Sequence, residues 1–206
     1  MQRRSFALLA LILAPVFATT VTAIADDGAS TPAAAPAANA EAIARGGYLV
    51  RFGMCNDCHT PWVMGPKGPG PDMTRELSGH PGNVPVPPAP AMTGGWVLAG
   101  FGTNTAFAGP WGISFTANLT PDKETGLGNW TEEMFITALR TGRHEGRGRP
   151  ILPPMPYRFV GSLNDDDLKA VFAYLRSIPA IKNKVPSPVD PPEETTKPDT
   201  KPETKR

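Results

Sequence analysis

The chain has two cysteines, and both belong to one short run, Cys-Asn-Asp-Cys-His, at positions 55–59. The spacing C-x-x-C-H is the attachment pattern of c-type haem. Each thiol can add to one of the two vinyl groups, and the adjacent imidazole can then bind the iron. We therefore predict that Cys55 and Cys58 bind haem c covalently and that His59 is an axial iron ligand. This motif constrains the fold strongly, because the large apolar faces of a haem must be packed into the domain.

The first 25 residues are typical of a cleavable secretory signal. They begin Met-Gln-Arg-Arg, continue with an apolar stretch to about Phe17, and end in Ala-Ile-Ala, so we place the cut after Ala25. Pro15 leaves too little continuous apolar length for a membrane anchor. The sequence therefore predicts export to the periplasm of a bacterium. In that oxidising compartment a bare C-x-x-C pair would tend to form a disulfide, which haem attachment prevents.

Composition divides the rest of the chain into three parts. Residues 26–40 are rich in Asp, Ala and Pro and are expected to form a flexible leader. Residues 186–206 alternate Pro with Lys, Glu and Asp and contain no aromatic residue, which indicates a disordered tail. Residues 41–185 are long enough for one core. They hold a single C-x-x-C-H run, so we predict one monohaem domain.

The charge balance gives no sign of a polyanionic partner. Without Arg3 and Arg4 of the signal, the 20 basic residues fall to 18, against 19 acidic ones. A net charge this close to zero favours neither nucleic acid nor an anionic membrane surface as a partner.

Three segments are expected to be helical. The first covers about residues 41–54, where Gly46 and Gly47 offer a flat patch for close packing against another helix. The second begins after the N-cap residue Thr131 and stops at Gly142. The third follows Asn164 and has apolar residues at helical spacing up to Ile178.

The segment between the haem motif and the second helix is rich in Gly and Pro, which makes helix improbable there. We expect at most a small β-hairpin, from short strands near residues 96–101 and 112–116. Together these signals predict a mostly α fold with three main helices around one haem and a long Gly/Pro-rich loop.

The sixth position of the iron needs a second ligand if the protein is to transfer electrons rather than bind small molecules. Met155 is our candidate, because the prolines of Leu-Pro-Pro-Met-Pro restrict the backbone on both sides and can hold the thioether towards the iron. Methionine–histidine ligation gives a relatively positive reduction potential. The other methionines are expected to have packing roles, and His80 and His144 to be polar surface residues. The other candidates for the sixth iron ligand are Met54, Met64, Met73, Met92, Met134, His80 and His144.

Several arginines surround this methionine, with Glu145 as the only acid among them. They are expected to bind the haem propionates, to form a docking rim for an acidic partner, or simply to face solvent. Trp111 and Trp130 are expected either to wall the haem or to belong to the core. The arginines are Arg140, Arg143, Arg147, Arg149 and Arg158.

Further motifs extend the pattern beyond the haem run. They are Asn-Leu-Thr-Pro-Asp at 118–122, Gly-Leu-Gly at 126–128 with Trp130, Ala-Leu-Arg at 138–140 and Leu-Pro-Pro-Met-Pro-Tyr at 152–157. With these motifs, residues 41–188 resemble class I c-type cytochromes, and in particular the haem domains in cytochrome c subunits of bacterial alcohol, gluconate and aldehyde dehydrogenases.

The resemblance implies that Cys55, Cys58, His59 and Met155 bind the haem and that the first and last helices cross closely. Many such subunits carry three haem domains, and this chain has one motif. Two roles therefore stay open. One is a diffusing carrier between a periplasmic dehydrogenase and a respiratory oxidase, and the other is a subunit fixed in a dehydrogenase complex.

Three other classes of function compete with electron transfer. A thiol–disulfide oxidoreductase would use the same cysteines, but the motif lacks a βαβ context. A zinc module would need paired ligands, and the other histidines are isolated in the sequence. A peroxidase-like haem enzyme would need an open iron site, which Met155 argues against. We therefore predict an electron-transfer protein that is not itself an enzyme.

Overall fold

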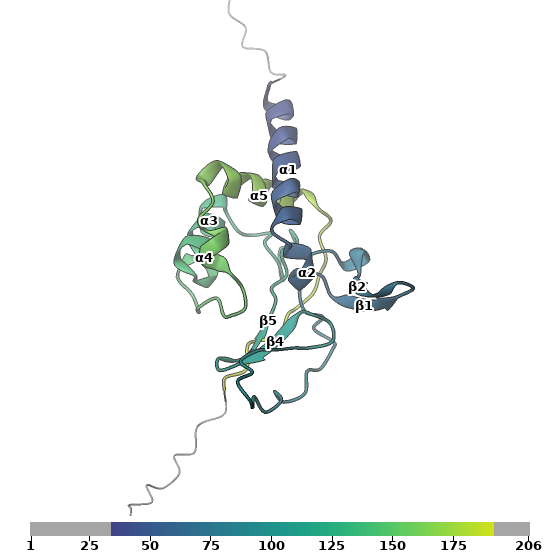
Figure 1. Cartoon of the computed structure of the whole chain (residues 1–206). Coiled ribbons are helices and arrows are strands. Elements are labelled where there is room, and N and C mark those ends of the chain that lie inside the picture. Colours follow the sequence, from purple (N-terminus) through teal and green to yellow (C-terminus); the bar gives the residue numbers. More distant parts are fainter. Residues whose placement is uncertain (1–33, 192–206) are drawn as a thin grey trace, which may run out of the picture. The chain divides into compact units, whose positions relative to one another are not determined.

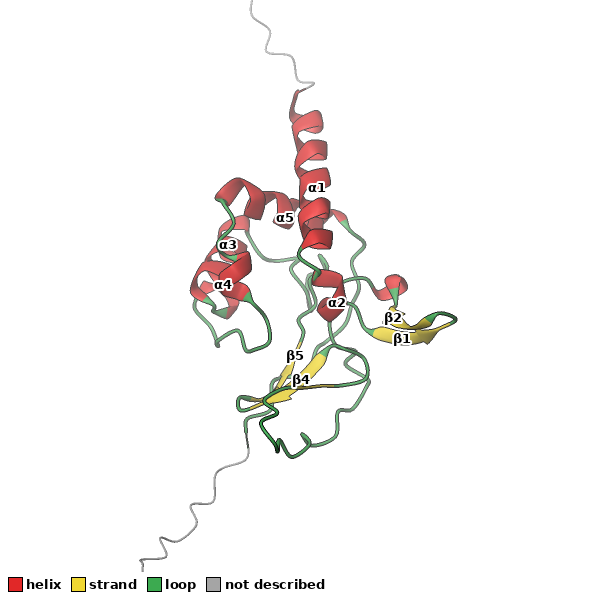
Figure 2. Ribbon diagram, viewed as in Figure 1, coloured by secondary structure: helices red, strands yellow, loops and turns green. Residues whose placement is uncertain are grey.

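The computed structural model describes residues 34–191. The expected signal peptide, most of the leader and residues 192–206 lie outside the described part. Figures 1 and 2 show helix α5 crossing helix α1, helices α3 and α4 together to one side, and two small sheets further along the chain. The α-helices are α1 (Ala34–Phe52), α2 (Cys55–His59), α3 (Glu132–Thr141), α4 (Tyr157–Val160) and α5 (Asp165–Ser177). The strands are β1 (Trp62–Gly65), β2 (Gly68–Pro71), β3 (Ala99–Gly100), β4 (Ala106–Gly109) and β5 (Gly112–Phe115), and two short 3-10 helices cover Met73–Arg75 and His144–Gly146.

The prediction of a mostly α fold with three main helices is wrong. The described residues contain five short to medium helices and two antiparallel sheets, one of order β1-β2 and one of order β3-β4-β5. The physical reason lies in the Gly/Pro-rich segment. Glycines at hairpin ends, such as Gly68 with φ 106° and Gly112 with φ 90°, allow tight two-residue turns. Parts of this segment therefore pair as strands, while residues 76–98 form a loop.

Helices α3 and α5 begin and end as their sequences predict. The Thr131 hydroxyl accepts a hydrogen bond from the Met134 amide at 3.1 Å, and Gly142 ends α3 in the left-handed conformation with φ 68°. The Asn164 side chain accepts from the Asp167 amide at 2.8 Å. These caps were readable because they depend on residues within one helical turn of each other.

Helices α1 and α5 pack at very close range, which confirms the expected role of the glycine pair. A Cβ atom on Gly46 would lie 1.9 Å from the carbonyl oxygen of Ala170, and one on Gly47 would lie 3.0 Å from the Tyr174 ring. The ion pair between Arg45 and Asp167, at 2.8 Å, joins the same two helices. The buried core continues from this crossing. It contains Val50, Leu77, Leu127, Phe135, Leu139, Leu168, Val171, Phe172 and Leu175.

The C-terminal part of the described chain returns to the sheet. Asn183 is buried, and its side-chain amide donates to the carbonyls of Ser78 at 2.7 Å and His80 at 2.9 Å. Val189, in the segment where a tail was expected to begin, exchanges two backbone hydrogen bonds with Ile113 at 2.8 and 2.9 Å. At the other end, α1 begins at Ala34, within the expected leader. No helix within residues 34–191 has the length and apolar character needed to cross a membrane.

His80 is fully buried, so its expected place at the surface is wrong. Its Nδ1 accepts a hydrogen bond from the Thr105 hydroxyl at 2.9 Å, and its Nε2 donates to the Val84 carbonyl at 3.1 Å. Burial, together with the nearby Arg75, lowers the pKa of His80 below its ordinary value of 6.5. The lowered pKa favours a neutral imidazole, because burial disfavours the charged ring.

This histidine predicts a dependence of stability on pH. As the pH falls, the unfolded chain takes up a proton near 6.5, before the folded chain does, so stability is complete above that value and declines below it. We expect the free energy of unfolding, from urea titrations, to fall between about pH 7 and about pH 5. His80→Gln should flatten this fall, and equal slopes in the two proteins would contradict the assignment.

Candidate haem site

The attachment motif forms a helix of its own, α2, directly after α1. Met54 separates the two helices in the left-handed conformation, with φ 55°, and so redirects the chain. Both cysteines are half-buried, and no disulfide joins them. Burial raises the pKa of Cys55 to about 11 and also raises that of Cys58. Such thiols stay protonated near neutral pH, whereas an attacking cysteine of a thiol–disulfide oxidoreductase needs a lowered pKa.

His59 is buried at the end of α2, and one of its ring nitrogens already has a partner. Nδ1 lies 2.8 Å from the carbonyl oxygen of Ala117, which can only accept, so Nδ1 carries the proton. Burial lowers the pKa of this imidazole and keeps it neutral. Nε2, which has no hydrogen-bond partner within residues 34–191, is left with a lone pair of the kind that binds a metal. The side chain therefore fits the role of an iron ligand.

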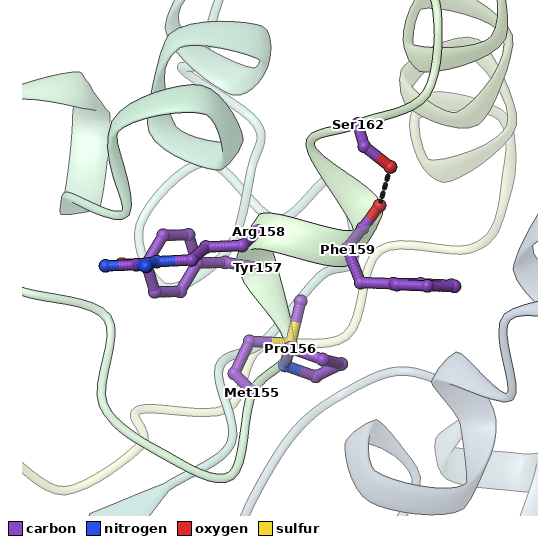
Figure 3. Close-up of a pocket in the computed structure, with 6 residues that line it drawn as sticks. All are labelled: Met155, Pro156, Tyr157, Arg158, Phe159 and Ser162. Atoms are coloured by element: carbon purple, nitrogen blue, oxygen red, sulfur yellow. Dashed lines mark hydrogen bonds between the residues drawn. The ribbon is translucent and has the colours of Figure 1, made fainter.

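Met155 lies in a different part of the chain and borders the same core as the attachment motif. Cys55 and Met155 are both partly buried against the core cluster defined above. Met155 also lines an open pocket of about 440 Å³ (Figure 3). Phe159 lies in this pocket with its side chain 81% exposed. An exposed aromatic ring beside a methionine is the kind of apolar surface against which a porphyrin face can pack. The pocket is lined by Met155, Pro156, Tyr157, Arg158, Phe159 and Ser162.

The five arginines around Met155 make different contacts. Arg140 donates to the carbonyls of Gly161 and Leu163 and pairs with Asp165 at 2.8 Å, so it joins α3 to the start of α5. Arg158 lies over the Tyr157 ring, as Figure 3 shows, and its guanidinium donates to the Tyr157 hydroxyl at 3.2 Å. The other three, Arg143, Arg147 and Arg149, are exposed.

The two tryptophans and His144 have structural contacts. Trp130 packs against the core cluster, and its ring meets that of the half-buried His144 edge-on at 5.1 Å. The Trp111 indole donates to the Ser114 hydroxyl at 3.3 Å. His80, another candidate ligand, has both ring nitrogens engaged in hydrogen bonds. The assignment of His59 and Met155 to the two axial positions stays a prediction, and among these side chains His80 is the one whose ring nitrogens are both engaged.

Sequence reasoning missed two residues near these side chains. Ala117 contributes a backbone carbonyl to His59, and Ser114 donates a hydrogen bond to the Pro153 carbonyl, two residues before Met155. A backbone acceptor leaves no signal in the sequence, because every residue has one. The Ser114 contact joins segments 39 residues apart, which no local pattern reveals.

No family model matches the chain. Among curated proteins, it is 31% identical over 147 residues to the cytochrome c subunit of the alcohol dehydrogenase (quinone) of Gluconobacter oxydans (strain 621H), which covers 70% of the chain. It is 30% identical over 164 residues, or 77% of the chain, to the fructose dehydrogenase cytochrome subunit of Gluconobacter japonicus. The gluconate 2-dehydrogenase cytochrome c subunit of Pantoea cypripedii is 29% identical over 167 residues, or 81% of the chain.

The chain contains a cytochrome c domain. The predicted resemblance to cytochrome c subunits of dehydrogenases is confirmed. The cytochrome spans about a quarter of the length of these subunits, since the alignments cover 23%, 26% and 27% of them.

Proposed function

We propose that this cytochrome carries single electrons in the periplasm through one haem c, bound covalently by Cys55 and Cys58. His59 and Met155 are its axial ligands. One observation carries the proposal. The attachment motif forms a helix in which Nδ1 of His59 is hydrogen-bonded to a carbonyl, while Nε2 has no partner in the described part of the chain. That arrangement is suited to an iron ligand of defined orientation.

The residues around the site would orient the iron ligands and set the reduction potential. When bound, the haem supplies an iron that exchanges one electron. The Ala117 carbonyl keeps the proton on Nδ1 of His59 and fixes the plane of its ring. The thioether of Met155 is a soft ligand that favours the reduced iron, which raises the reduction potential. The core cluster that Cys55 and Met155 border supplies apolar side chains on one side of the site.

The electron donor in this proposal is a periplasmic dehydrogenase. This choice of donor rests on the names of the relatives, which are cytochrome subunits of alcohol, fructose and gluconate dehydrogenases. The electron then passes towards a respiratory oxidase. The same names favour a second arrangement, in which the cytochrome stays bound to the dehydrogenase as its subunit. Size-exclusion chromatography of the periplasmic extract distinguishes the two arrangements. A fixed subunit elutes together with its dehydrogenase, whereas a diffusing carrier elutes alone.

The haem attachment has a direct test. We expect protein purified from the periplasm to show a c-type visible spectrum. After denaturation and acid extraction, its molecular mass should still include one haem. Changing both Cys55 and Cys58 to alanine should abolish covalent haem, because no other thiol is present in the sequence. Asp57→Ala, between the two cysteines, is the matched control and should keep it. A colourless wild-type protein with free thiols or bound zinc would overturn the proposed function.

A further inference from the structure

Strand β5 and the residues after it contact both segments that carry the axial ligands. At Ala117 the backbone carbonyl accepts the hydrogen bond of His59 at 2.8 Å. Three residues earlier, the Ser114 hydroxyl lies 2.6 Å from the carbonyl of Pro153. One short stretch of extended chain therefore reaches the histidine side of the site through its backbone and the methionine side through a side chain.

The Ser114 hydroxyl is set up to donate to Pro153. The Trp111 indole N–H donates to the Ser114 oxygen at 3.3 Å, so the hydroxyl proton is free to point at a carbonyl. Of the two carbonyls nearby, that of Pro153 is much closer than that of Phe107, which lies at 3.3 Å. Ser114 is 7% exposed, so water competes little for this bond.

The loop that carries Met155 has few other hydrogen bonds to the rest of the domain. Its three prolines, at positions 153, 154 and 156, have no N–H to donate. The Met155 amide donates to Leu152 at 3.3 Å, and its carbonyl accepts from Tyr157 at 2.9 Å, both within the loop or α4. In the described part of the chain, the Ser114 bond is the one hydrogen bond that joins residues 152–156 to a segment outside residues 151–160.

We propose that Ser114 is a positioning residue for Met155. Its hydroxyl fixes the loop of residues 152–156 to β5, and residues 114–117 thereby set the separation between Met155 and His59. This inference rests on the proposed function, because it concerns how firmly the methionine is held at the iron.

The experiment measures how easily an added ligand displaces the methionine from the oxidised holoprotein. Imidazole is titrated while the methionine–iron absorption band is followed. We expect Ser114→Ala to bind imidazole about five- to tenfold more tightly than wild type, since the loop loses one buried hydrogen bond. Trp111→Phe removes the indole N–H that donates to the Ser114 oxygen. It should raise the affinity for imidazole too, by a smaller factor.

Thr116 provides a matched control on the same stretch of chain. Its hydroxyl is buried and has no hydrogen-bond partner among residues 34–191, so Thr116→Val should leave the imidazole affinity unchanged. An unchanged affinity in Ser114→Ala would overturn the inference. So would an equal increase in Thr116→Val, because a general loosening of the strand would then explain both. A wild-type holoprotein without the methionine–iron band would instead overturn the proposed ligation, which separates the two failures.

Discussion

Met155→Ala is expected to convert the cytochrome into a protein that binds carbon monoxide in the reduced state. Alanine cannot reach the iron, and the pocket beside Met155 is already open on the side of Phe159. Loss of the soft sulfur also removes the preference for reduced iron. We expect the reduction potential to fall by at least about 60 mV, which corresponds to a tenfold change in relative affinity for a one-electron couple.

Carbon monoxide difference spectra and a redox titration measure both effects. Met64→Ala is the control, because Met64 lies close to His59 in the sequence and is 79% exposed on β1. It should change neither the carbon monoxide spectrum nor the potential. If Met155→Ala keeps the wild-type potential and excludes carbon monoxide, another residue is the sixth ligand.

Gly46→Leu is expected to cost the holoprotein at least about 3 kcal/mol of unfolding free energy. Any Cβ at this position meets the carbonyl oxygen of Ala170, which is part of the α5 backbone and cannot rotate away. The two helices would have to separate, which would also disturb the ion pair between Arg45 and Asp167. Thermal and urea unfolding of the purified holoprotein, followed by circular dichroism, measure the loss.

Ala44→Leu gives a comparison on the same helix, since Ala44 is exposed. The added side chain should leave stability within about 0.5 kcal/mol of wild type. A Gly46→Leu protein as stable as Ala44→Leu would show that the crossing of α1 and α5 is not tightly packed in solution.

The features that the sequence made predictable are local. The caps at Thr131 and Asn164 lie within one turn of the amides they bind, and the haem motif is a run of five residues. The glycine pair was also readable, because two adjacent glycines inside a helix are costly unless a neighbour needs the space.

The features that were missed depend on pairings between segments, which the composition of one segment does not show. Strands were expected near residues 96–101 and 112–116, where β3 and β5 lie, but each of them pairs with β4, and the β1–β2 hairpin was not expected. His80 is buried because Thr105 and Val84 supply partners for both ring nitrogens, and an isolated histidine in a sequence carries no sign of such partners. The contacts of Ala117 and Ser114 belong to the same class, since each joins segments separated by tens of residues.

The crossing of α1 and α5 also bears on the order of events during folding. The partners Arg45 and Asp167 are 122 residues apart, so a long loop must close before α5 can cover α1. Closing so long a loop is slow compared with forming local contacts. During that interval the motif at 55–59, which directly follows α1, belongs to a chain that cannot yet close over it. The late arrival of α5 thus provides a period in which both thiols stay accessible for modification.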